Sequence, residues 1–156
     1  IGVSNFYPDR LSDICAFNKI TPQINQVETN TFNQQIEAQE NMIKNNVQIE
    51  AWAPFGEGRN DMFNNSVLKK IADKYQKSVA QVILRWLTQR GVVALAKSVN
   101  SNRMHENFTI FDFKLSDDDM NTIKELDTKN SLFFNHQDPN TVDMFVQFVK
   151  ERAMLD

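Results

Sequence analysis

The sequence predicts an α/β fold in which four short parallel strands alternate with helices, equivalent to half of a (β/α)8 barrel. Strand-like and helix-like segments alternate from one end of the chain to the other. The connections between the strands are helical and too long for hairpins, which favours parallel pairing. A complete barrel of this type takes roughly 250 residues, so four units in 156 residues amount to about half of one. We expect residues 1–156 to form a single domain.

The four strands are predicted from short apolar or alternating segments. Residues 47–52 alternate apolar and polar side chains, and residues 92–96 form a continuous apolar run between Gly91 and Lys97, typical of a strand buried on both faces. The other two predicted strands are 1–6, which reads as buried, and 24–28. Because the chain opens inside a predicted strand, we expect the N-terminal part of a larger protein to be missing.

Helical spacing of apolar residues predicts the connections. Ser78 is placed to cap one helix and Gly91 to end it, and Ser116 with Asp119 resembles a capping box that opens another helix. The remaining periodic segments are 9–18, 34–45, 67–75, 79–87, 102–108 and 141–152. A doubly wound open sheet is the alternative that periodicity leaves open, but the four glycines never form its G-x-G-x-x-G phosphate loop.

Composition narrows the class of protein. The formal net charge is −3, from 17 Lys and Arg against 20 Asp and Glu, so no basic excess supports nucleic-acid binding. The longest near-apolar run, 91–96, is far shorter than the ~20 residues that span a bilayer. The single Cys15 excludes an internal disulfide framework and fits a reducing compartment. We therefore expect a soluble cytoplasmic protein.

Ligands of such barrels bind at the carboxyl ends of the strands, and the side chains there suit binding more than catalysis. Hydroxyl and amide groups at Ser4, Asn5 and Gln26 are suited to orienting an amide or a hydroxyl group. Trp52 offers a flat face for an aromatic ring. Lys97, Ser98 and Arg103 place two cations and a hydroxyl beside a helix N-terminus, as a phosphate site requires. The residues together describe a site for an aromatic, phosphorylated ligand.

Each of these residue types also has an ordinary structural role. Residues 4–5 are also typical of a turn at a strand end. Gln26 is also typical of a side chain that forms hydrogen bonds with backbone groups in a barrel core. Trp52 also suits a hydrophobic core, and Lys97 and Arg103 also suit an exposed charged surface.

Groups able to catalyse proton transfer or hold a metal are not apparent. The acidic run 117–119 is typical of residues that interact with the positive end of a helix dipole, and this interpretation is favoured over a metal site. His105 and His136 lack partners at metal-ligand spacing, and Cys15 has no nearby cation or histidine and suits packing. We expect no catalytic residue and no metal ligand in this chain.

Six blocks of sequence resemble the aldo-keto reductase family, in the family's order and over nearly the whole chain. The residues in these blocks are most similar to those of the bacterial diketogluconate reductase branch. The blocks are 1–6 (IGVSNF), 25–28 (NQVE), 51–56 (AWAPFG), 81–86 (QVILRW), 97–107 (KSVNSNRMHEN) and 111–116 (FDFKLS). The resemblance implies the C-terminal half of a (β/α)8 barrel, meaning its last four β/α units and a C-terminal helix.

The resemblance also implies NADPH as the cofactor and a role for each matched residue. Ser4, Asn5 and Gln26 would bind the nicotinamide carboxamide, Trp52 would stack on the nicotinamide, and residues 54–57 would line the pyrophosphate path. Lys97, Ser98 and Arg103 would hold the 2′-phosphate, and Glu106 and Asn107 would contact adenine. The full predicted set is Ser4, Asn5, Gln26, Trp52, Ala53, Pro54, Phe55, Gly56, Lys97, Ser98, Val99, Arg103, Glu106 and Asn107. Three departures from the family pattern are Ala53 for Ser, Ala96 for Pro and Asn100 for a hydroxyl residue.

Catalysis in the family uses an Asp, Tyr, Lys and His tetrad that lies on the earlier half of the barrel. The resemblance therefore implies that the parent protein reduces small aldehydes or ketones with NADPH, while this chain alone is inactive. An alternative is a non-catalytic half-barrel that associates with itself through its exposed edges. A further alternative is a nucleotide-binding module.

Overall fold

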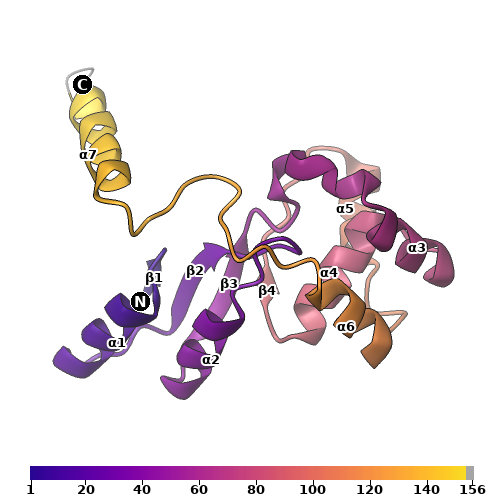
Figure 1. Ribbon diagram of the computed structural model, residues 1–156, viewed down its shortest axis with the longest axis horizontal. Coiled ribbons are helices and arrows are strands. Elements are labelled where there is room, and N and C mark those ends of the chain that lie inside the picture. The colour runs from indigo at the N-terminus through magenta and orange to yellow at the C-terminus, as the bar shows by residue number, and fades with distance from the viewer. Residues whose placement is uncertain (154–156) are drawn as a thin grey trace.

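The computed structural model describes residues 1–153 and shows strands and helices alternating along the chain (Figure 1). The elements are β1 (Gly2–Ser4), α1 (Pro8–Phe17), β2 (Ile24–Glu28), α2 (Ile36–Lys44), β3 (Gln48–Trp52), the 3₁₀ segment η1 (Gly56–Asn64), α3 (Ser66–Tyr75), α4 (Val79–Gln89), β4 (Val93–Ala94), α5 (Ser101–Phe108), α6 (Asp117–Lys124) and α7 (Pro139–Ala153). No helix within residues 1–153 is long and apolar enough to cross a membrane.

The four strands form one parallel sheet in the order β1-β2-β3-β4. Neighbours in the chain are therefore neighbours in the sheet, as in a (β/α)8 barrel. A doubly wound sheet instead reverses its strand order at a switch point. The pairing sets Ser4 beside Gln26 and Gln26 beside Glu50. The carboxyl ends of the strands consequently lie along one edge.

One face of the sheet is covered by helices. Val27, Ile49 and Ala51 are buried on that face, and they join α4 residues such as Trp86 and Leu87 in one hydrophobic core. The intervening residues Gln26 and Glu50 point to the other face and are only partly buried. The alternation of buried and part-buried residues in β3 explains why that strand was predictable from its period of two.

Side-chain caps define the starts of several helices. Ser78 and Gln81 form a reciprocal capping box at α4, and Ser116 and Asp119 form another at α6. At α3, the Asn65 side chain accepts from two backbone amides of the first turn. Both predicted caps are thereby confirmed.

The predicted fourth strand is wrong in length and burial. Only Val93 and Ala94 pair as a strand, and the side chains of Val93 and Leu95 are 44% and 48% exposed. Within the described residues β4 pairs with β3 alone, so its other edge has no partner to bury it. The first strand differs in the same way, because Gly2 and Ser4 are exposed at the opposite edge of the sheet.

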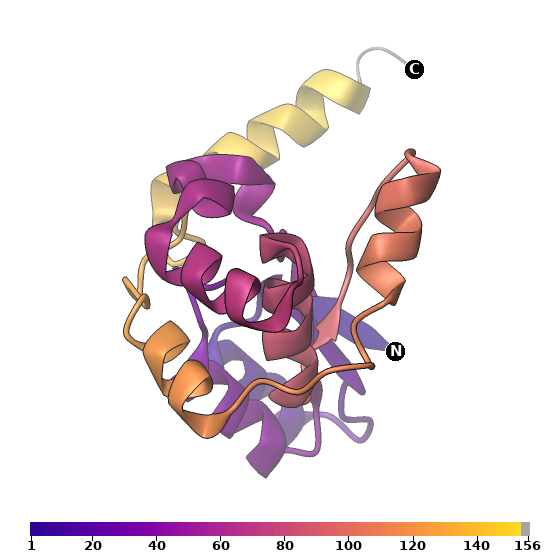
Figure 2. The same cartoon turned by 90° about the vertical axis from the view of Figure 1, so that its right-hand side faces the viewer.

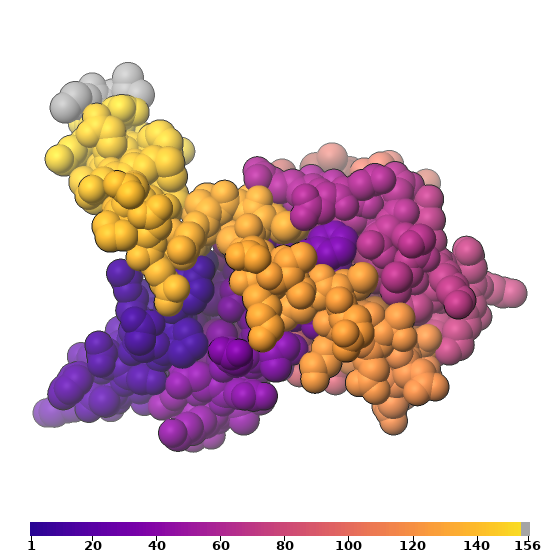
Figure 3. All heavy atoms as spheres, viewed as in Figure 1, coloured from indigo at the N-terminus to yellow at the C-terminus, as the bar shows by residue number. Residues whose placement is uncertain are grey.

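Two segments after β4 extend the structure in different directions. The loop 109–116 runs from α5 back to α6 on the other side of the molecule (Figure 2). Gln81 and Gln89 of α4 hold this loop by donating to the carbonyls of Thr109 and Leu115. The C-terminal helix α7 stands out from the body above β1 and α1 (Figure 3).

Candidate functional site

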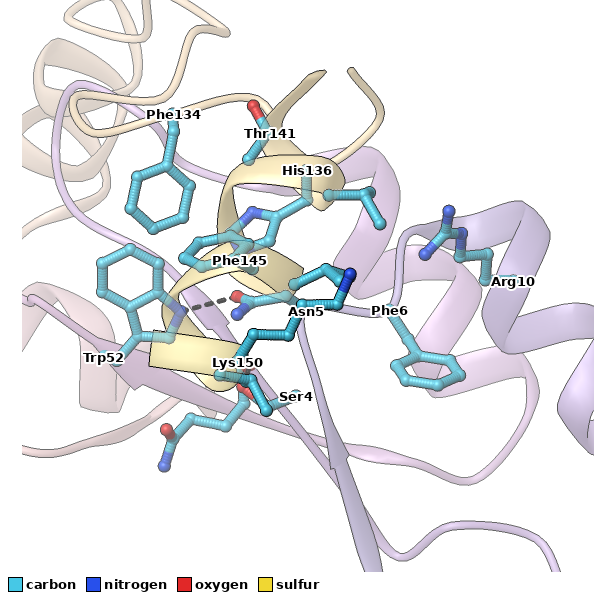
Figure 4. A pocket seen from close by; sticks show the side chains of 14 residues that line it. Ser4, Asn5, Phe6, Arg10, Trp52, Phe134, His136, Thr141, Phe145 and Lys150 are labelled. Atoms are coloured by element: carbon cyan, nitrogen blue, oxygen red, sulfur yellow. Dashed lines mark hydrogen bonds between the residues drawn. The ribbon is translucent and has the colours of Figure 1, made fainter. Parts of the chain in front are cut away.

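The predicted site residues divide between two cavities. The first, here called the strand-end cavity, has a volume of about 910 Å³ and lies between the carboxyl ends of β1 to β3 and α7 (Figure 4). Four predicted residues line it, namely Ser4, Asn5, Gln26 and Trp52. The second, here called the α5 cavity, has a volume of about 440 Å³. Six predicted residues line it, namely Phe55, Lys97, Ser98, Arg103, Glu106 and Asn107.

Asn5 is held in place at the end of β1 by its backbone and by its side chain. Its φ of +58° turns the chain sharply after the strand, and its backbone N–H donates to the Gln26 carbonyl at 2.9 Å. The indole Nε1 of Trp52 donates to Asn5 Oδ1 at 2.8 Å. A hydrogen bond to β2 therefore fixes the backbone of Asn5, and a hydrogen bond from β3 orients its side chain.

Gln26 is oriented in the same way by neighbouring strands. Its Nε2 donates to Glu50 Oε1 at 2.5 Å, and its backbone carbonyl accepts from the Ser4 hydroxyl at 3.1 Å. Within residues 1–153, Asn5 Nδ2 and Gln26 Oε1 have no hydrogen-bond partner, which leaves one donor and one acceptor beside the cavity. A primary carboxamide carries the complementary acceptor and donor. These residues therefore suit a primary carboxamide.

Trp52 is partly packed and partly open to the strand-end cavity. The ring centroids of Phe133 and Phe134 lie 5.0 Å and 6.4 Å from the indole, and the Phe134 ring is inclined to it by only 27°. Both readings of Trp52 from sequence thus apply in part, because the ring contacts aromatic neighbours and still lines the cavity. The sequence did not reveal Phe133 and Phe134, which lie about 80 residues further along the chain.

The α5 cavity brings together the residues predicted to hold a phosphate and an adenine. Lys97 and Arg103 are exposed cations that form no ion pair among the described residues. Glu106 and Asn107 follow on the same helix, and Phe55 and Phe63 supply an aromatic wall. Two cations, a hydroxyl at Ser98 and an apolar wall fit a phosphorylated, aromatic group.

The amides at the start of α5 are less available than the sequence suggested. The Asn100 side chain accepts from the backbone amides of Asn102 and Arg103 at 3.0 Å and 3.1 Å. Those two amides are already satisfied, as at an ordinary N-cap. The Ser98 hydroxyl also donates to the Asn100 carbonyl, at 3.3 Å, so the anion-binding capacity of this cavity comes mainly from the side chains of Lys97 and Arg103.

Four predicted residues line neither cavity. They are Ala53, Pro54, Gly56 and Val99. Val99 is 89% exposed. Gly56 has a φ of +53°, and a Cβ there would lie 2.8 Å from Leu132 and 2.9 Å from Met62. The structure thus shows a packing requirement for glycine at this position.

Glu28 was not predicted as a site residue. It holds the segment that carries Phe133 and Phe134 beside the strand-end cavity. Its side chain is buried at the end of β2 and accepts hydrogen bonds from the Ser131 hydroxyl and from the Leu132 backbone amide, the latter at 3.0 Å. The hydroxyl of Ser131 in turn accepts from the amides of Phe133 and Phe134. Glu28 therefore positions the two rings that contact Trp52. No local sequence signal could have linked residues 103 positions apart.

Asp119 of the acidic run and His136 take structural positions, whereas Asp117, Asp118 and His105 are exposed. Asp119 accepts from Lys74 Nζ at 2.7 Å and from the Tyr75 hydroxyl at 2.6 Å. His136 packs between the rings of Phe134 and Phe145, and burial lowers its pKa. The structure shows no cluster of three or more potential metal ligands anywhere in residues 1–153.

Comparison with known proteins gives a family match over most of the chain. The sequence model described as the aldo/keto reductase family matches residues 1–128. Aldose reductase C of Dictyostelium discoideum is 48% identical over 126 residues, which are 81% of this chain and 39% of that protein. Glyoxal reductase of Bacillus subtilis is 44% identical over 126 residues, covering 81% and 45%. The chain thus spans less than half the length of these relatives.

Solved structures agree with the fold. An aldo-keto reductase from a Medee basin deep-sea metagenome has a TM-score of 0.84 at 37% identity, covering 88% of this chain and 51% of the other. An aldo-keto reductase of Bombyx mori in complex with NADP has a TM-score of 0.80 at 30% identity, covering 86% and 46%. A structure described as a 2,5-diketo-D-gluconic acid reductase B has a TM-score of 0.81 at 29% identity, covering 88% and 48%. The predicted resemblance and partial (β/α)8 barrel are confirmed.

Proposed function

The chain belongs to the aldo/keto reductase family, and from this membership we propose that it forms the cofactor-holding side of an NADPH-dependent carbonyl reductase. The observation that carries the proposal is the grouping of Lys97, Ser98 and Arg103 around the α5 cavity. The 2′-phosphate of NADPH is the group that two unpaired cations and a hydroxyl would recognise. NADH lacks that phosphate and would gain nothing from them.

The described residues have binding and orienting tasks in this proposal. When bound, NADPH supplies the hydride that reduces a carbonyl carbon to an alcohol. Asn5 and Gln26 would hold the carboxamide through their free donor and acceptor and so fix which ring face meets the substrate. Trp52 would contact the nicotinamide ring from the cavity wall.

We assign the proton that the carbonyl oxygen requires to a part of the parent protein outside this chain. The titratable side chains beside the strand-end cavity are Arg10, His136 and Lys150. Arg10 and Lys150 are cations, and His136 is packed between aromatic rings. Relatives carry further chain beyond the matched region. Residues 1–156 alone should therefore bind cofactor without reducing carbonyl compounds at an enzymatic rate.

A fluorescence titration of this chain with NADPH and NADH tests the proposal. We expect saturable quenching of tryptophan emission with NADPH and a dissociation constant at least about tenfold lower than for NADH, because each charge-assisted contact contributes ~1.5–3 kcal/mol. Replacing both Lys97 and Arg103 by Ala should remove the preference. Replacing Lys44 and Lys70, which are exposed on other helices, by Ala serves as the charge-matched control and should leave it intact. Equal affinity for the two cofactors, or no saturable binding, contradicts the proposal.

A further inference from the structure

The charge on the wall of the strand-end cavity is one-sided. Arg10 from α1 and Lys150 from α7 line it, and none of its lining residues is Asp or Glu. This contrasts with a chain whose formal net charge is −3. Within the described residues neither Arg10 nor Lys150 forms an ion pair. No carboxylate in the described part of the chain therefore neutralises either cation at the cavity wall.

The two cations lie on different helices, Arg10 on α1 and Lys150 on α7, and both line the strand-end cavity. Arg10 lies on the far side of the cavity from Trp52 and Phe134, and its guanidinium points toward the cavity (Figure 4). Burial lowers the pKa of His136, the negative charge of Glu28 raises it, and the positive charge of Arg10 lowers it. The charge of Arg10 therefore acts on another residue that lines the cavity.

The rest of the wall is apolar and aromatic. Phe134 and Phe145 lie edge to face with their centroids 5.0 Å apart, and Val142, Val146 and Val149 continue the apolar surface along α7. A volume of about 910 Å³ is at the upper end of the ~300–1,000 Å³ usual for small-molecule sites. A nicotinamide ring at the Trp52 end would leave space for a second, apolar molecule beside these rings.

We propose that the strand-end cavity selects carbonyl compounds that carry a carboxylate on an apolar or aromatic body, with Arg10 and Lys150 as the specificity residues for the carboxylate. The inference rests on the proposed function, since it names the substrate class of that same site. The aromatic and valine side chains receive the body of the substrate, and the two cations hold its anionic end. Cationic carbonyl compounds are repelled by the same pair.

The test uses two ketones that differ in charge alone, 4-acetylbenzoate and 4-acetylbenzamide. Titration calorimetry on the chain saturated with NADP⁺, which cannot deliver a hydride, measures binding without turnover. We expect the benzoate to bind about tenfold more tightly than the benzamide and this preference to weaken as salt is added. In the variant with Arg10→Gln and Lys150→Gln, the ratio of the two affinities should fall to about one.

A matched control and a separate readout keep the inference distinguishable from the proposed function. Replacing Lys19 and Lys70 by Gln removes the same charge away from the cavity and should preserve the preference. NADPH affinity should be unchanged in the Arg10 and Lys150 variant, because the 2′-phosphate residues line the other cavity. Equal affinity for the two ketones in the unaltered chain, binding of neither, or a preference that persists in the variant overturns this inference alone. Failure of the unaltered chain to bind NADPH overturns the proposed function.

Discussion

Asp119 shows how the position of one side chain distinguishes it from identical neighbours. The sequence places Asp117, Asp118 and Asp119 together at the start of a helix and singles out Asp119 only as the partner of Ser116 in a capping box. The structure buries only Asp119, whose carboxylate accepts from Lys74, Tyr75 and Ser116. Burial alone would raise the pKa of Asp119, but these hydrogen bonds outweigh it and lower the pKa to about 2.

This pKa predicts how stability depends on acidity. An unfolded Asp titrates near ~3.9, so the folded state favours the charged form and gains stability above that pH. The gain should be lost as the pH falls from about 4 through about 2. In Asp119→Asn the free energy of unfolding at pH 7 should drop by about 1–3 kcal/mol, and its decline between pH 4 and 2 should become shallower. Urea denaturation at a series of pH values measures both effects.

The neighbouring Asp118 provides the control for that experiment. It lies exposed in the same helical turn, so Asp118→Asn removes an equal charge from the same helix N-terminus. We expect it to leave the acid limb of the stability curve almost unchanged. If the two variants behave alike, the helix dipole accounts for the stabilisation and the hydrogen bonds of Asp119 do not.

At the scale of elements, α4 is the helix that the sequence specifies most completely. Its apolar side chains recur at helical spacing, and the reciprocal bonds of Ser78 and Gln81 satisfy amides at its start. Ser78→Ala should lower the free energy of unfolding by about 0.5–2 kcal/mol, because the amide of Gln81 loses its acceptor. Thermal or urea denaturation measures the change. Ser66→Ala is the matched control, since Ser66 follows the cap of α3 and should cost much less; equal losses in the two variants would contradict the capping argument.

Elements without a local signal were predicted poorly. The segment η1 has no helical spacing, and its turns depend on positive φ angles at Glu57, Asn60 and Asp61, which composition does not predict. Residues 92–96 have the apolar composition of a buried strand, yet most of that run stays unpaired at the sheet edge. Helices with caps and periodicity were therefore located to within a few residues, while edges and irregular turns were not. Their conformation depends on neighbours that are distant in the sequence.

At the scale of the whole molecule, the clearest feature that sequence could not predict is the burial of residues 29–34. Thr29, Asn30 and Thr31 are fully buried although all three side chains are polar. The loop is held internally by Asn30, whose Oδ1 accepts from the backbone amides of Phe32 and Asn33. Contacts from distant segments complete its burial. They include Gln34 Nε2 donating to the Ile123 carbonyl and Arg90 Nη2 donating to the Gln34 carbonyl.

The same long-range organisation divides the candidate site into a predictable and an unpredictable part. Ser4, Asn5 and Trp52 were predictable because each stands where a strand ends, and Gln26 because it lies two residues before the end of β2, beside Ser4. The wall formed by Phe133, Phe134 and α7 was not predictable. It reaches the site through the hydrogen bonds of Glu28 to Ser131 and Leu132, which no periodicity encodes.

Glu28 joins the sheet to segment 131–134, which crosses the carboxyl edge of the sheet. Glu28→Gln keeps the shape of the side chain but removes the charge that Ser131 and Leu132 recognise, at a cost of about 1–3 kcal/mol. Since those contacts lie at one edge, we expect segment 131–134 to detach locally while α4 remains folded. Hydrogen exchange should accelerate at the amides of Leu132, Phe133 and Phe134 and stay slow at Leu87, and tryptophan emission should shift to the red as Trp52 loses its aromatic neighbours. Glu40→Gln, on the exposed side of α2, should change neither signal. A uniform acceleration that includes Leu87 would instead make Glu28 part of the global core, and the aromatic wall of the cavity would then unfold only with the whole protein.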